Sequence, residues 1–402
     1  MKFKDELKIV GFPYFISLTF WIAFGIMAAY WVLYFADIGL SFTQIGLIFI
    51  ANSIAMFLFE IPTGAVAVTF GRKVSVGLAY LTAGGAYLAM LLSGANFWLL
   101  FCFHFIAGIG WTMESGAFEA WFVDTVKHKK KSKHLHHLMG RWRSMGSIGF
   151  IIGPFIGATL IGYGYDKALL ATSLLTICLG LTILIFGKEI YFKKQKTHIK
   201  ENIKSTIKNA KFAINYAKKH STIILLTIIS FLFILGTTLV YSSYQPHVVN
   251  MGIKPSYIGY ALSIAGILMA IQLNYSKKIK DFFGSNKRSL IVISSLFVLA
   301  GITMGLTKYI PLLFIAMILY AGFYDMAGNQ APAFREILNK VIPSKHRASI
   351  LSVSAWVGAL GFILGDLSFG LIADTLGPRT GVLTGVGIIL LAVLLYFKLP
   401  KE

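Results

Sequence analysis

Long apolar segments recur along the whole chain, and they constrain the fold more than any other feature. A run of about twenty apolar residues, coiled as an α-helix, crosses the ~30 Å hydrocarbon core of a bilayer. The sequence therefore predicts an all-α integral membrane protein with twelve transmembrane helices. The predicted spans are residues 11–35, 43–68, 74–94, 97–123, 140–163, 168–187, 222–246, 256–274, 289–306, 311–334, 348–373 and 380–397.

The composition excludes a water-soluble globule. Hydrophobic residues make up 56% and charged residues 13% of the 402 residues, and the mean hydropathy is +0.73. Average soluble domains carry about 25% charged residues. An aromatic content of 14% also excludes intrinsic disorder. Because Cys102 and Cys178 both lie inside apolar runs, the sequence predicts neither a disulfide framework nor a thiolate metal cluster. No other metal site and no cofactor are expected.

The basic residues are distributed unevenly over the loops. If the N-terminus lies inside the cell, the outer loops contain only Lys167, Lys254, Lys308 and Arg379 of the 37 Lys and Arg residues. This asymmetry obeys the positive-inside rule and predicts a multi-pass protein of the cell membrane with both termini in the cytoplasm. The net charge of +21 then reflects topology and contact with anionic lipid, so no nucleic-acid partner is expected.

The two halves of the chain repeat each other. A polar, amphipathic stretch at 188–221 separates an N-terminal half, 1–187, from a C-terminal half, 222–402. An offset of 213 positions maps Gly39 onto Gly252, and similar offsets relate further glycines of the two halves. Two pseudo-symmetric six-helix bundles predict an alternating-access transporter, with its site near the bilayer midplane.

One cytoplasmic loop carries a motif of a known family. Residues 64–73 read G-A-V-A-V-T-F-G-R-K, which is similar to the G-x-x-x-D-R-x-G-R-K motif of the major facilitator superfamily. The resemblance covers the whole chain and implies a gating loop. In the family, the acid of this motif contributes to a latch, but Val68 replaces it here, whereas the C-terminal copy keeps an acid. The gating residues implied are Gly64, Gly71, Arg72, Lys73 and Asp281.

A second motif lies in the predicted fifth span. Gly140, Gly149, Gly153, Pro154 and Gly157 resemble the G-x8-G-x3-G-P-x2-G-G signature of the drug/proton antiporter branch, with alanine in place of the last glycine. The resemblance implies proton-coupled efflux. The physical interpretation is that glycines four residues apart let two helices approach closely, and generic helix packing remains the alternative explanation.

Four acidic residues within the predicted spans are the candidate functional groups: Glu114, Glu119, Asp325 and Asp366. A carboxylate at the centre of a membrane helix costs at least ~2.5 kcal/mol on insertion scales, so each requires a reason. The middle of each predicted span lacks Lys and Arg, and we therefore expect proton-coupling or substrate sites. Asp124, near a cytoplasmic end, is expected to have a capping, turn or basic partner.

On a continuous helix, aromatic residues surround one of these acids. At 100° per residue, Trp111 and Phe118 lie on the same face as Glu114, and Asn329 shares a face with Asp325. Aromatic rings around a carboxylate suit a lipophilic organic cation, through charge pairing and cation–π contact. Ordinary lipid-facing or core packing of the aromatic residues is the alternative.

The favoured function is proton-coupled efflux of hydrophobic, cationic small molecules by alternating access. A proton symporter or facilitator of a polar metabolite is the first alternative, and a membrane-embedded enzyme or lipid scramblase is the second. No phosphate-binding G-x-x-x-x-G-K-[ST] loop occurs, so nucleotide-driven pumping is disfavoured. The expected partners are the substrate, protons and the lipid bilayer, and the chain is expected to act as a monomer without enzymatic activity.

Overall fold

The computed structural model describes residues 2–189, 191–192, 211, 215–342 and 347–400. Within these residues all regular structure is helical. The described part contains 11 helices long and apolar enough to cross a membrane, together with a shorter apolar helix at Ile310–Met326. The predicted all-α membrane fold is confirmed. Most of the predicted linker at 188–221, with its amphipathic pattern, lies outside the described residues.

The chain forms two compact units. The first comprises Met1–Tyr34 and Ala51–Asn202, and the second comprises Phe35–Ile50 and Ile203–Glu402. The expected division at 1–187 and 222–402 remains a prediction. It differs from these units in one segment, because residues 35–50 group with the second unit.

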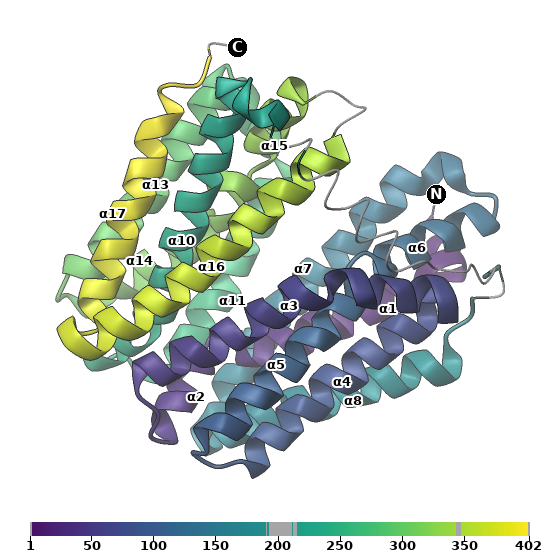
Figure 1. Cartoon of the computed structure of the whole chain (residues 1–402), viewed down its shortest axis with the longest axis horizontal. Coiled ribbons are helices and arrows are strands. Elements are labelled where there is room, and N and C mark those ends of the chain that lie inside the picture. The colour runs from purple at the N-terminus through teal and green to yellow at the C-terminus, as the bar shows by residue number, and fades with distance from the viewer. Residues whose placement is uncertain (1, 190, 193–210, 212–214, 343–346, 401–402) are drawn as a thin grey trace. The chain divides into compact units, whose positions relative to one another are not determined.

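In the first unit, helix α1 packs along α7, and α4 packs between α5 and α8 (Figure 1). Apolar side chains on these helices form the core, and the remaining apolar faces are exposed, as expected for helices in contact with lipid. The helices that lie wholly or partly in this unit are α1 (Phe3–Ala28), α2 (Trp31–Asp37), α3 (Phe42–Phe70), α4 (Arg72–Leu92), α5 (Phe97–Glu114), α6 (Ala117–His128), α7 (Leu135–Leu160) and α8 (Tyr165–Phe186).

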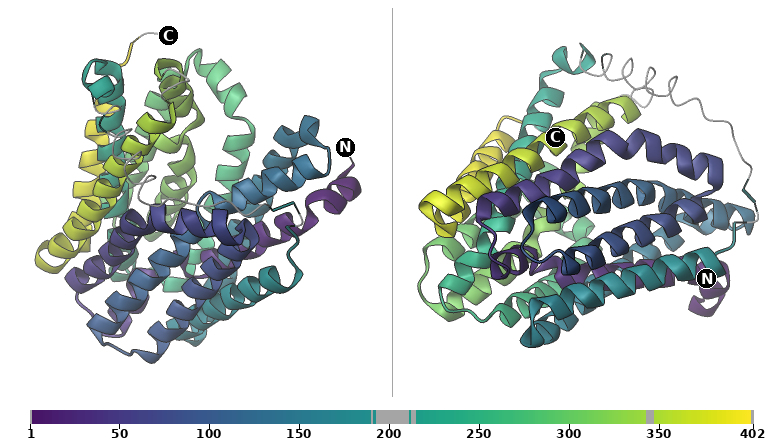
Figure 2. Two further views of the ribbon diagram at one scale, coloured as in Figure 1. Left: turned by 45° about the vertical axis from the view of Figure 1, so that its right-hand side comes forward. Right: turned by 60° about the horizontal axis from the view of Figure 1, so that its bottom comes forward.

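In the second unit, α10 packs against both α16 and α17, and α11 packs against α14. The two further views in Figure 2 show α10 in teal beside α17 in yellow. The helices of this unit are α10 (Ser221–Asn250), α11 (Pro255–Asn274), α12 (Ser276–Phe283), α13 (Asn286–Leu306), α14 (Ile310–Phe323), α15 (Pro332–Val341), α16 (Arg347–Leu376) and α17 (Pro378–Tyr396).

The glycines of the antiporter-like motif determine how closely α1 and α7 pack. A Cβ at Gly149, Gly153 or Gly157 would overlap backbone carbonyl oxygens of α1. The ring of Pro154 lies against Gly25 of α1. Gly140 differs, because a Cβ there would meet no atom within 4 Å. Three of the four glycines thus permit the close helix contact that their spacing predicts.

Candidate functional site

The fourth predicted span is broken at its acidic residue. Helix α5 ends at Glu114, Gly116 adopts a left-handed conformation with φ of +70°, and α6 begins at Ala117. The hydroxyl of Ser75 donates to the carbonyl oxygen of Met113 at 2.6 Å and so satisfies one acceptor at the break. The expectation of one continuous helix over 97–123 is therefore wrong. The left-handed backbone at Gly116 interrupts the helix, and glycine adopts this conformation without strain.

The tenth predicted span is broken at the equivalent place. Helix α14 ends at Phe323, and two short 3₁₀ turns, Tyr324–Met326 and Gly328–Gln330, precede α15. Gly328 has φ of +63°, and an offset of 212 positions maps Gly116 onto it. In each break, the left-handed glycine follows an acid by two or three residues: Glu114 in the first unit and Asp325 in the second. Discontinuous membrane helices are typical of transporter binding sites.

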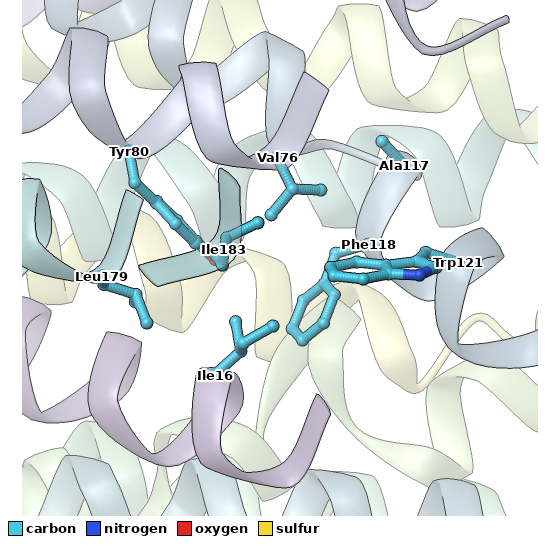
Figure 3. Packing of buried hydrophobic residues seen from close by; sticks show 8 residues of the cluster. All are labelled: Ile16, Val76, Tyr80, Ala117, Phe118, Trp121, Leu179 and Ile183. Atoms are coloured by element: carbon cyan, nitrogen blue, oxygen red, sulfur yellow. The ribbon is translucent and has the colours of Figure 1, made fainter. Parts of the chain in front are cut away.

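The break also moves an aromatic residue that was predicted to flank Glu114. Phe118 is 3% exposed and belongs to the core of the first unit, where its ring contacts those of Trp121 and Trp142. Figure 3 shows Phe118 packed among Ile16, Val76 and other members of this cluster. The interpretation that Phe118 shares a face with Glu114 is wrong, because the two residues belong to different helices.

Trp111 lies before the break and lines a pocket within the first unit. The other lining residues are Phe20, Phe24, Trp31, Tyr87, Thr172 and Thr176. The indole N–H of Trp111 donates to the hydroxyl of Tyr87 at 3.1 Å, which fixes the orientation of the indole ring. The rings of Phe20 and Phe24 pack edge-on against it, with centroids 5.3 and 6.2 Å away. Trp111 therefore belongs to an aromatic pocket, one turn before Glu114.

Glu114 is half-buried at the last position of α5. Its carboxylate interacts electrostatically with Tyr80, whose hydroxyl is buried with no hydrogen-bond partner among the described residues. In the same part of the chain, no hydrogen bond or ion pair involves the Glu114 side chain. Glu119 lies on α6 and is exposed. The structure therefore separates the two acids, and Glu114 is the one that follows Trp111 of the aromatic pocket by three residues on the same helix.

Asp325 has a different environment, in a 3₁₀ turn of the second unit. Arg335 of α15 interacts electrostatically with its half-buried carboxylate. The Arg335 guanidinium also donates to the side-chain carbonyl of Gln330 at 2.5 Å. Asp325 therefore has a basic neighbour, which lies on α15 just beyond the predicted span 311–334. Asn329 lies in the following 3₁₀ turn, so the expected helical face shared with Asp325 is absent.

Asp366 is the most buried of the predicted acids. It lies on α16 with 6% of its surface exposed, and Ser242 of α10 forms a hydrogen bond with its carboxyl group. Gly46 of α3 packs on the backbone carbonyl of Asp366. The second unit therefore encloses this acid between α10, α16 and the first turns of α3.

The N-terminal gating motif forms a charged corner of the first unit. Gly71 has φ of +103° and makes the turn, after which the backbone N–H groups of Arg72 and Lys73 donate to the Glu189 carboxylate at 3.1 and 2.9 Å. The Arg72 side chain forms an ion pair with Asp124. The expected basic partner of Asp124 is confirmed. Sequence reasoning missed Glu189, which follows the sixth span with no motif to mark it.

Gly64 does not contribute to this turn. It lies inside α3, which continues to Phe70, and a Cβ on Gly64 would meet no atom within 4 Å. Of the two motif glycines, only Gly71 therefore lies at the turn, because the helix extends through most of the motif.

The equivalent corner of the second unit uses a different acid from the one predicted. Asp281 is exposed on α12, whereas its neighbour Lys280 donates to both carboxylate oxygens of Glu336, at 2.8 and 2.9 Å. The hydrogen bond from Lys280 lowers the pKa of Glu336 to about 2. An offset of 212 maps Asp124 onto Glu336, so the acid is duplicated while its basic partner comes from another position.

Comparison with known proteins identifies the family. The model of the Major Facilitator Superfamily matches residues 13–365. The uncharacterized MFS-type transporter YxaM of Bacillus subtilis is 24% identical over 396 residues, which cover 94% of this chain and 93% of that protein. Multidrug resistance protein 2 of Bacillus subtilis is 22% identical over 308 residues, 72% of this chain and 74% of that one.

The solved structures agree on the fold. A crystal structure of the nucleoside transporter NupG, in a mutant form, has a TM-score of 0.77 at 16% identity and covers 97% of this chain and 99% of its own. At this identity the likeness concerns the fold alone. The family match, which extends over most of the chain, decides the classification: the chain belongs to the Major Facilitator Superfamily and is a multi-pass membrane transporter rather than an enzyme.

Proposed function

We propose that the protein exports hydrophobic, cationic small molecules in exchange for protons. The observation that carries the proposal is the position of Glu114, half-buried at the break of a membrane helix and one turn from the aromatic pocket that contains Trp111. Its carboxylate has no ion-pair partner among the described residues of its unit. A carboxyl group in such surroundings binds either a proton or an organic cation.

Competition between these two ligands supplies the coupling. When the cation occupies the carboxylate, aromatic rings of the pocket contribute cation–π and apolar contacts. Protonation of Glu114 removes the negative charge and therefore weakens cation binding. A proton gradient directed inwards then drives the cation outwards, provided that the carboxylate is reached alternately from the two sides.

Two further observations support this proposal. The glycine strip on α7 matches the spacing of the antiporter signature, and the glycines at 149, 153 and 157 contact α1 closely. Multidrug resistance protein 2, which is similar over 72% of this chain, is named for resistance to drugs. The predicted localisation in the cell membrane, with both termini in the cytoplasm, agrees with export from the cell.

The test is gradient-driven transport in proteoliposomes with ethidium as the cationic probe. We expect accumulation that depends on an imposed pH gradient and that falls about tenfold, equivalent to ~1.4 kcal/mol, in Glu114→Gln. Glu119→Gln is the matched control, because Glu119 is exposed on the next helix and should leave transport unchanged. Equal transport by the wild type and Glu114→Gln would contradict the proposal.

A proton-coupled carrier of a polar metabolite is the second candidate. Arg335, near Asp325, supplies the basic group that a polar or anionic substrate would contact. The nucleoside transporter NupG shares the fold. Uptake of a labelled nucleoside down a proton gradient, without ethidium transport, would favour this candidate over export of cations.

A further inference from the structure

The first turns of α1 are set off from the rest of that helix. Val10 has non-helical φ and ψ angles of −131° and 19°, which kink α1 near its start. Before the kink, Phe3 and Leu7 are 44% and 45% exposed and, four residues apart, lie on one face. Lys4 and Lys8 are exposed on the neighbouring face. Apolar side chains beside lysines are typical of a helix that lies in the membrane interface.

Contacts with α7 hold this segment in place. Glu6 is fully buried, accepts a hydrogen bond from Nε2 of His137 at 2.7 Å, and lies 3.8 Å from Nε of Arg141. The hydroxyl of Tyr14 donates to the same carboxylate at 3.4 Å. The guanidinium of Arg141 also lies over the ring of Phe3, 5.7 Å from its centroid. Because the charge of Glu6 is compensated within this cluster, it does not offset the exposed lysines nearby.

A turn rich in lysine follows α6. Its exposed basic residues are Lys127, Lys129, Lys130, Lys131 and Lys133. Within the described part of the chain, none of these five lysines forms an ion pair with an acid. A positive surface without acidic partners attracts anions.

The lysine-rich turn lies beside the start of α1. Val126 at the end of α6 shares a buried apolar cluster with Val10 and Tyr14 of α1 and with Leu138 of α7. His134, which follows the turn, interacts electrostatically with lysines 131 and 133 and with His137, the residue that binds Glu6. Figure 1 shows the N-terminus beside α6. We call the five lysines of the turn, together with Lys4 and Lys8, the lysine patch.

One lysine of the turn adopts a conformation that favours glycine. Lys130 has φ of +55°, and the next backbone N–H, of Lys131, donates to the carbonyl oxygen of Val126 at 3.1 Å to close the helix end. Glycine is the usual residue at such a position, because a Cβ there is crowded. Lysine at position 130 therefore adds a charge to the patch at the cost of backbone strain.

We propose that the lysine patch, together with Phe3 and Leu7, binds an anionic diacyl phospholipid of the leaflet predicted to face the cytoplasm. The lysines contact the phosphate of the headgroup, and the two apolar side chains contact the acyl chains. These exposed apolar residues favour a lipid over a soluble phosphate compound, which would leave them in water. The proposal goes beyond the export of cations and does not depend on it.

The test is lipid binding by the purified full-length protein in a neutral detergent. Native mass spectrometry measures the dissociation constant of the first phosphatidylglycerol bound. We expect it to bind at least about tenfold more tightly than phosphatidylcholine, which carries no net charge. The combined variant Lys129→Gln, Lys131→Gln and Lys133→Gln should weaken phosphatidylglycerol binding at least about tenfold, because each lysine near an anionic surface contributes about a factor of five.

The matched control removes three exposed lysines of the second unit, which lie on the same predicted side of the membrane: Lys218→Gln, Lys219→Gln and Lys277→Gln. It should bind phosphatidylglycerol as the wild type does. Equal affinities of the wild type and the patch variant, or an equal loss in the control, would overturn the site.

Lys130→Gly separates binding from folding. Glycine adopts the left-handed conformation without strain, so the midpoint of thermal unfolding should be unchanged or higher. Phosphatidylglycerol binding should nevertheless weaken about fivefold, because one charge is lost. Unchanged binding by this variant would contradict the proposal.

Two further measurements distinguish a lipid from a soluble phosphate ligand. Leu7→Ser should weaken phosphatidylglycerol binding severalfold, because its side chain no longer contacts an acyl chain. Leu92→Ser, at an 86% exposed apolar position of α4, is the control. Inorganic phosphate, added at constant ionic strength, should not displace the lipid. Displacement by phosphate together with unchanged binding in Leu7→Ser would refute a lipid site and indicate a soluble phosphate ligand.

The assay is independent of the efflux measurement. It uses no transported substrate, so an absence of ethidium export leaves the expected affinities unaffected. Normal export together with unchanged lipid affinities would refute the lipid site and leave the proposed function standing.

Discussion

The breaks in α5–α6 and α14–α15 are the same structural device in different electrostatic surroundings. In each, a left-handed glycine follows an acid, and Gly116 and Gly328 are related by the internal repeat. Glu114 adjoins aromatic rings, with no ion-pair partner among the described residues of the first unit. Asp325 lies near the guanidinium of Arg335.

This difference indicates a division of labour between the halves. A nearby cation stabilises the charged form of an acid. A carboxyl group without a nearby cation lacks this stabilisation, so a change in its hydration more readily makes it take up or release a proton. We therefore assign the variable charge of the transport cycle to Glu114. Asp325, which has a basic neighbour in Arg335, is expected to contribute less to it.

Alanine substitutions of Gly116 and Gly328 are expected to give the largest difference in stability between the two breaks. A Cβ at Gly328 would overlap the ring of Phe233, whereas a Cβ at Gly116 would meet no atom within 4 Å. We expect Gly116→Ala to cost ~1 kcal/mol, from the left-handed backbone alone, and Gly328→Ala to cost ~2–4 kcal/mol because overpacking is added. Thermal unfolding in detergent measures both, with Gly387→Ala on α17, where space is open, as control. Equal losses would show that the two breaks are packed alike.

The ion pair between Lys280 and Glu336 is expected to contribute a smaller amount to stability, and this contribution depends on pH. Lys280 holds the pKa of Glu336 at about 2, against 4.5 for the free residue. The resulting stabilisation is present above pH 4.5 and is lost as the pH falls towards 2. Because Glu336 is 40% exposed, Glu336→Gln should cost only ~0.2–1 kcal/mol at pH 7.

The same thermal unfolding assay at pH 7 and pH 3 checks this expectation. The difference between wild type and Glu336→Gln should shrink at pH 3, when the carboxyl group begins to take up its proton. Asp281→Asn, on the neighbouring helix, should resemble the wild type at both values. A larger effect of Asp281→Asn than of Glu336→Gln would restore Asp281 as the gating acid of the second unit.

Sequence reasoning was most successful where a regular residue pattern has a direct physical cause. Long apolar runs predict membrane helices because the bilayer imposes their length, and the spacing of Gly149, Gly153 and Gly157 predicts a close helix contact. The place of Asp124 near the predicted cytoplasmic end favoured a capping, turn or basic partner, and the structure shows the basic one, Arg72.

The helix breaks were missed because Ser115 and Gly116 lie inside an apolar run, where a single glycine is a weak signal. The repeat contains the clue, since it aligns Gly116 with Gly328. Long-range partners such as Glu189 and Asp374 leave no local pattern, because tertiary packing alone brings them to the helix N-termini that they cap. Glu6, which is fully buried and bonds to His137 at 2.7 Å, was missed for the same reason.

Proton release on substrate binding tests the assignment of the coupling acid most directly. Purified protein in weakly buffered detergent solution near neutral pH is mixed with tetraphenylphosphonium, and the protons released are counted with a pH indicator. We predict release from the wild type and from Asp325→Asn, and none from Glu114→Gln. Release that persists in Glu114→Gln but disappears in Asp325→Asn would contradict the division of labour and place the exchangeable proton at the second break.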